Sequence, residues 1–120
     1  MALVAAVLIV ATVTLHSLLG ERRLIGPMLA TRGGVLDNGF ARAVVRFAWH
    51  FTSAIGLVVA AALVAAALRP EALREVLLVM GGIIFTVAGL IDGVVTRGRH
   101  VGWPFVTATG LACLGAYWLN

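Results

Sequence analysis

The sequence has no lysine, a single cysteine and only five acidic residues, and charged residues occupy 12% of its 120 positions. Soluble domains are about a quarter charged, so this composition does not describe a water-exposed surface. The lone Cys113 excludes an intrachain disulfide and a cysteine-rich metal site. Nine arginines give a net charge of +4. They flank apolar runs, which favours a role in membrane topology over binding to nucleic acid.

Long apolar runs fill the remainder, with 62% hydrophobic residues and a mean hydropathy of +1.07. A membrane span needs roughly 20 such residues, and four runs approach or exceed this length, at about 2–19, 41–68, 76–95 and 101–119. We therefore expect an all-α fold, a four-helix bundle forming one integral membrane domain. The connections are short except at about 20–40, where apolar residues mixed with Gly, Pro, Asp and Asn predict an interfacial or re-entrant loop. A short amphipathic helix near 24–30 is compatible with this stretch, but Gly26 and Pro27 argue against a long one.

Arginine placement predicts the orientation of these spans. Seven arginines fall on one side: Arg22, Arg23, Arg32, Arg42, Arg46, Arg97 and Arg99. Only Arg69 and Arg74 fall on the other. Because positive residues concentrate in cytoplasmic loops, we expect a multi-pass protein of the bacterial inner membrane with both termini outside the cytoplasm. The first run lacks the basic start of a signal peptide, so we expect it to be a retained span.

Several polar residues fall at one expected depth of the membrane. At 1.5 Å per residue, His16, His50 and Asp92 each lie roughly 6 to 8 Å inside the nearest charged or helix-ending residue. His100 begins the fourth run on the same side. Polar residues within spans usually face the protein interior and pair with one another. One interpretation is that they are structural, joining helices by hydrogen bonds.

The alternative interpretation is a binding site that opens toward the cytoplasm. Arg42, Arg46 and His50 recur at every fourth position, so they form one stripe along a helix. Glu21 and Asp92 are natural partners for these arginines. A group of this kind could bind an anion, relay protons or hold a metal. The candidate site residues are His16, His50, His100, Asp92, Glu21, Arg42 and Arg46.

Two cofactors are compatible with these residues. Two histidines and a carboxylate suit a divalent transition metal, so His16, His50 and His100 are the candidate ligands, although no recognised zinc-binding spacing accompanies them. A b-type haem held between facing histidines of a helical bundle is the other alternative.

Three stretches, "HSLLGERRLIGPML" at 16–29, "RFAWHFTS" at 46–53 and "GRHVGWP" at 98–104, carry a resemblance. They are similar to stretches of a group of small, uncharacterised bacterial four-span membrane proteins. The resemblance covers about a third of the chain and contains the same three histidines. It implies no activity and no binding residues.

These patterns predict a non-enzymatic membrane protein whose cytoplasmic-side cluster binds an ion, small ligand or cofactor, in transport or as an accessory subunit. The alternative is a purely structural subunit that packs against a larger membrane complex through glycine-rich helix faces. A third class, an intramembrane redox enzyme, would need a bound chromophore. The expected partners are the lipid bilayer and either further copies of the chain or a larger membrane complex, with no nucleic acid.

Overall fold

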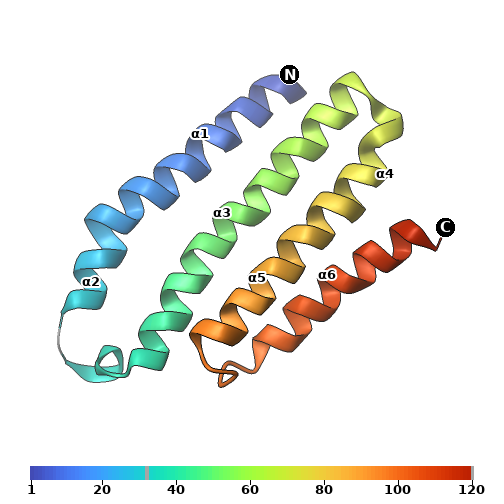
Figure 1. Ribbon diagram of the computed structural model, residues 1–120. Helices are drawn as coiled ribbons and strands as arrows, with labels where there is room; N and C mark the ends of the chain where they lie inside the picture. Colours follow the sequence, from blue (N-terminus) through green and yellow to red (C-terminus); the bar gives the residue numbers. More distant parts are fainter. Residues whose placement is uncertain (32, 120) are drawn as a thin grey trace.

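The computed structural model describes residues 1–31 and 33–119, whose regular structure is helical throughout with no strand (Figure 1). Helix α1, Ala2–Gly20, continues through a π-helical turn, Glu21–Ile25, into α2, Gly26–Ala30. The other long helices are α3, Gly39–Leu68, α5, Gly81–Val95, and α6, Gly102–Trp118. Shorter segments join them: 3₁₀ turns at Gly34–Asp37 and Pro70–Ala72, α4 at Leu73–Glu75 and a π-helical turn at Val76–Met80.

Three helical segments are long and apolar enough to cross a membrane, Ala2–Ala30, Gly39–Leu68 and Pro70–Val95. Helix α6 is shorter, at 17 residues. The two termini lie at the same end of the molecule, opposite the loop that precedes α3 and the turn between α5 and α6 (Figure 1). The fold is therefore two antiparallel helical hairpins with the same orientation.

The loop expected at about 20–40 is much shorter, because the first helical segment continues to Ala30. Gly26 and Pro27, which were expected to interrupt the helix, follow this π-helical turn and begin α2. Gly26 N–H bonds to the carbonyl of Glu21, and a Cβ at Gly26 would lie 2.8 Å from that oxygen. Pro27 then falls in the first turn of α2, where its missing N–H costs little. The glycine and proline mark a change of helical pitch here instead of a helix end.

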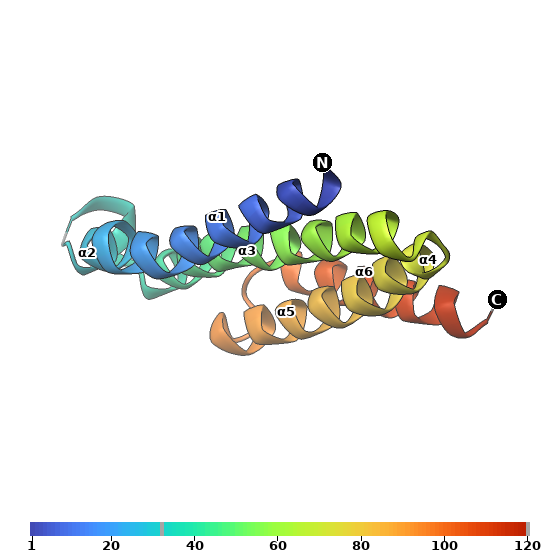
Figure 2. The same ribbon diagram turned by 90° about the horizontal axis from the view of Figure 1, so that it is seen from above.

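The four long helices lie side by side in the order α1, α3, α5, α6 (Figure 1) and form a thin layer when viewed from above (Figure 2). The Cα extents are 51 × 33 × 14 Å. At the usual 8 to 10 Å between helix axes, four helices in a row would span roughly 29 to 35 Å. The arrangement is therefore an open, twisted row: the all-α fold with four long helices is as expected, and the four-helix bundle takes the form of a layer.

Small residues allow close contact within each hairpin. A Cβ at Gly110 of α6 would lie 2.3 Å from both the backbone nitrogen and Oγ1 of Thr86 in α5. In the other hairpin, a Cβ at Gly56 of α3 would lie 2.5 Å from Cγ1 of Val13 in α1. Helices that approach this closely contact through backbone as well as side chains. Each hairpin is thus a well-packed unit, and the site described next lies where the two units meet.

Candidate functional site

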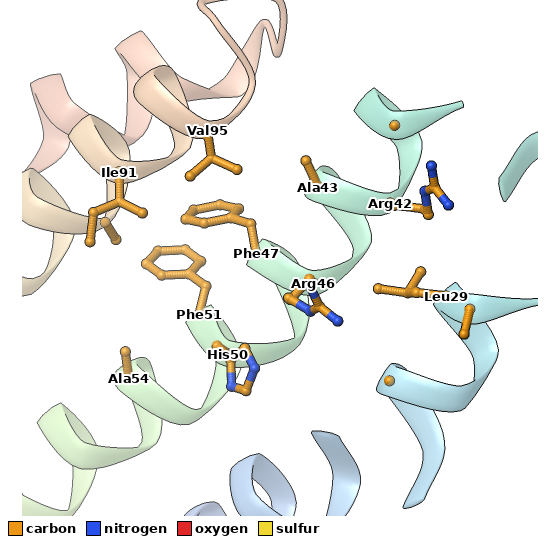
Figure 3. A pocket seen from close by; sticks show the side chains of 14 residues that line it. Leu29, Arg42, Ala43, Arg46, Phe47, His50, Phe51, Ala54, Ile91 and Val95 are labelled. Carbon is orange, nitrogen blue, oxygen red and sulfur yellow. The ribbon is translucent and has the colours of Figure 1, made fainter. Parts of the chain in front are cut away.

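A pocket of about 810 Å³ lies over α3, flanked by α2 on one side and α5 on the other (Figure 3). Its floor is one face of α3, from Gly39 to Ala54. Phe47 and Phe51 point toward Ile91 and Val95 of α5 and form the apolar wall. On the other side, the polar side chains point toward the α1–α2 segment (Figure 3). The pocket lining comprises Gly26, Leu29, Ala30, Gly39, Arg42, Ala43, Arg46, Phe47, His50, Phe51, Ala54, Ala88, Ile91 and Val95.

Glu21 connects the polar wall of the pocket to α1. One carboxylate oxygen, Oε1, lies 2.9 Å from the guanidinium of Arg46, and the other, Oε2, lies 3.2 Å from Nε2 of His50. The side chains of Glu21, Arg46 and His50 remain 30%, 52% and 41% exposed, respectively. Glu21 thus pairs with an arginine, as the sequence predicted, and also orients the His50 ring.

Two serines extend this network into the contact between α1 and α3. Ser17 Oγ lies 3.1 Å from Nδ1 of His50 and 2.9 Å from Oγ of the buried Ser53. If Ser17 donates to Ser53, both ring nitrogens of His50 must donate, as in an imidazolium. If both hydroxyls reverse, Ser17 donates to Nδ1 and the ring is neutral. The same heavy-atom positions therefore accept His50 in either protonation state.

Arg42 lines the same pocket one helical turn before Arg46. Unlike the Arg46 guanidinium, the Arg42 side chain makes no hydrogen bond or ion pair with any residue in 1–31 or 33–119. Arg42, Arg46 and His50 all lie on the pocket wall, consistent with their spacing of four residues. Among the described residues, Glu21 is the only acidic side chain paired with either guanidinium group, so this end of the pocket carries a net positive charge.

His16 lies outside this group and does not line the pocket. Its ring stacks on Trp49, with 3.9 Å between centroids, and its Nε2 lies 3.3 Å from the hydroxyl of Thr52. Trp49 Nε1 donates to the His16 backbone carbonyl at 3.1 Å. Because α1 continues into α2, His16 also lies well inside the helical segment and not near its end. These contacts join α1 to α3, as the structural interpretation of His16 predicts.

Asp92 and His100 form a separate pair beside the turn between α5 and α6. Asp92 is fully buried, and its Oδ2 accepts a hydrogen bond from Nδ1 of His100. Its other oxygen, Oδ1, has no hydrogen-bond partner among the residues that the structure describes. The turn is closed by Gly98 N–H bonding to the Gly93 carbonyl at 2.7 Å, the long hydrogen bond of a Schellman motif. Asp92 was expected to pair with an arginine, but the tight turn between α5 and α6 places the His100 ring against its carboxylate instead.

The candidate residues therefore do not form one cluster. Glu21, Arg46 and His50 meet at the pocket, and Arg42 lies beside them, whereas Asp92 and His100 lie behind its apolar wall. Phe47 separates the two groups: it lines the pocket, and its ring centroid is 6.4 Å from that of His100 in an edge-on contact.

The cofactors considered from sequence find little support in these contacts. Within residues 1–31 and 33–119, no three His, Cys, Asp or Glu side chains gather where they could hold a metal ion. At the pocket, Glu21 and His50 lie together, but the Arg46 guanidinium beside them repels a cation. For a haem, His50 offers no free ring nitrogen to the iron, because Ser17 and Glu21 engage both of its nitrogens. This donor set suits an anion better than a metal.

The apolar half of the pocket and Ser53 are not among the residues that the sequence predicted for the site. Phe47 and Phe51 are four residues apart and stack at 5.3 Å, a spacing that predicts a shared helix face. Ser53 follows His50 by three residues, which places it on the same side of α3. In an apolar helix, however, such spacing does not distinguish a pocket wall from a lipid-facing surface.

Comparisons with protein-family models, with curated proteins and with solved structures found no match to this chain.

Proposed function

We propose that the chain is a non-enzymatic membrane protein whose pocket over α3 binds a small ligand that is partly apolar and partly anionic. The four long helices would be four spans of the bacterial inner membrane, with α6 the shortest. The arginine-rich end of the row would face the cytoplasm, because positively charged residues concentrate there. Both termini would then lie outside the cytoplasm.

One observation carries this proposal: the pocket combines an apolar wall with a cationic end. Phe47, Phe51 and Ile91 offer apolar surface on the side of α5, and Arg42 and Arg46 lie on the side of α2, toward the start of α3. Ligand sites in proteins are mostly apolar with a few polar groups that orient the ligand. Arg42 has no acidic partner among the described residues, so its charge is available to a ligand.

The proposal is tested by mass spectrometry of the intact protein purified in mild detergent. The wild type should retain one amphiphile per chain. Ala54→Trp, which fills the pocket floor, should lose it, whereas Ala48→Trp should retain it because exposed Ala48 lies on α3 outside the pocket. Equal retention by the wild type and both variants, or retention by none, would refute a binding role for the pocket.

A structural subunit of a larger membrane complex is the second candidate, and the open row favours it. Both edges of the row are unpaired, and α1 carries exposed Val7 and Leu8, which are 67% and 61% accessible. In that case α1 would contact a partner helix. Cysteine crosslinking from Val7→Cys, in a Cys113→Ser background in native membranes, should then yield one defined product. A matched Val87→Cys on α5 is the control.

A further inference from the structure

Building on the proposed function, we infer that the ligand of the pocket is an anionic phospholipid of the cytoplasmic leaflet. Its phosphate would lie between Arg42 and Arg46, and one acyl chain would follow α3 past Phe47 and Phe51 to Ala54. Four features support this assignment: the length of the pocket, its depth, its charge and its apolar walls.

The pocket has the length of one leaflet. Helix α3 has 30 residues and is about 45 Å long, close to the total thickness of a bilayer with its headgroups, about 40 to 45 Å. The pocket begins at Gly39, the first residue of α3, and ends at Ala54, which lies at the middle of the helix. This distance is about 22 Å along the helix axis. A pocket that runs from the headgroup region to the bilayer midplane matches a single lipid molecule.

The charged residues lie at the headgroup end of this path. Arg42 is three residues from the start of α3, and it has no acidic partner in the described part of the chain. Arg46 is one turn deeper and shares Glu21 with His50. Guanidinium groups bind phosphate oxygens through paired N–H donors. The cytoplasmic leaflet is also where anionic lipids attract arginine-rich protein surfaces.

The apolar walls exclude a small hydrophilic anion as the preferred ligand. Beyond His50, the α3 residues of the pocket are Phe51 and Ala54, and α5 adds Ala88, Ile91 and Val95. A free phosphate ion would bind at Arg42 and leave this surface empty. A zwitterionic lipid would fill the surface but bring its own cation close to the guanidinium groups. An anionic phospholipid satisfies both halves of the pocket.

The test titrates detergent-purified protein with phosphatidylglycerol, phosphatidylcholine or inorganic phosphate and counts bound molecules by mass spectrometry of the intact complex. Wild type should bind one phosphatidylglycerol per chain, roughly five- to tenfold more tightly than phosphatidylcholine. Arg42→Gln should remove this preference, whereas Arg69→Gln, at the opposite end of α3, should keep it. Ala54→Trp should weaken binding of both lipids, and Ala48→Trp should weaken neither.

Each contrary result has a distinct meaning. Equal affinity for the two lipids, with Ala54→Trp still weakening both, would overturn the anionic phospholipid but leave the proposed binding function standing. Phosphate binding that Arg42→Gln abolishes and Ala54→Trp leaves intact would identify a site for the free anion instead. A dimer that Ala54→Trp converts to a monomer would show that a second copy occupies the pocket. If neither Ala54→Trp nor Arg42→Gln altered lipid binding, both the inference and the proposed function would fail.

Discussion

The Asp92–His100 pair predicts an unequal response to removing its two members. Asp92 is fully buried, whereas the His100 side chain is 30% exposed. In His100→Ala, the Asp92 carboxyl stays buried after losing the partner of Oδ2, and Oδ1 already has no partner among the described residues. In Asp92→Ala, the remaining imidazole is partly exposed, so it is not left buried without a partner. The first change should therefore be the more damaging.

The structure supports an estimate of the difference. Removing one member of a buried ion pair costs about 3 to 5 kcal/mol, and the partial exposure of His100 favours the lower value, about 3 kcal/mol. Removing Asp92 costs one hydrogen bond and a small cavity, about 1 kcal/mol. The double variant leaves no buried carboxyl, so it should resemble Asp92→Ala. The coupling free energy between the two residues should then equal the cost of His100→Ala, about 3 kcal/mol.

The assay is equilibrium unfolding of the detergent-solubilised protein with increasing sodium dodecyl sulfate. Cys113, the only thiol in the chain, reports unfolding through its labelling by a fluorogenic maleimide. The two single variants and the double variant complete a mutant cycle with the wild type. A His100→Ala variant that is as stable as Asp92→Ala, or effects that simply add in the double variant, would refute the buried-pair reasoning.

Three further predictions use the same unfolding and binding assays. Gly110→Ala should destabilise the α5–α6 hairpin by about 1 to 3 kcal/mol, because its Cβ would lie 2.3 Å from the backbone nitrogen of Thr86. The control Gly115→Ala, whose Cβ would have no atom within 4 Å, should leave stability unchanged. Equal effects of the two variants would contradict this packing. Thr86→Val should cost no stability, because it removes a buried hydroxyl that has no hydrogen-bond partner in the described chain; a loss above about 1 kcal/mol would reveal an unseen partner. Glu21→Gln should tighten phosphatidylglycerol binding about twofold or more by releasing Arg46, and weaker binding would show that Glu21 orients the site.

The positions of the long helices along the chain follow from the sequence, but which helix packs against which does not. Apolar runs and flanking arginines indicate where α3, α5 and α6 lie. In a chain that would be surrounded by lipid, both faces of each helix can be apolar, so hydrophobic periodicity gives little information on which face meets another helix. An open row of helices and a closed bundle therefore cannot be told apart by their pattern of apolar residues. The continuation of α1 past Gly26 was missed because a π-helical turn, set by local backbone fit, has no composition of its own.

The site was predictable to the extent that it depends on spacing within one helix. Arg42, Arg46 and His50 line one pocket because residues four apart share a helix face. The partner of Asp92 could have been deduced from the short turn, which brings His100 back beside it. The role of Glu21 was harder to deduce, because it depends on the register between α1 and α3, where Gly56 and Val13 fit together.

A row of helices has no enclosed interior, and this changes how a ligand would reach the pocket. The pocket lies on one face of the layer, over α3, so a lipid would arrive by lateral diffusion within the leaflet and not from water. In that two-dimensional solvent, lipid molecules are always in contact with the protein. Occupancy would then depend on the proportion of anionic lipid in the leaflet, and discrimination between headgroups would matter more than absolute affinity.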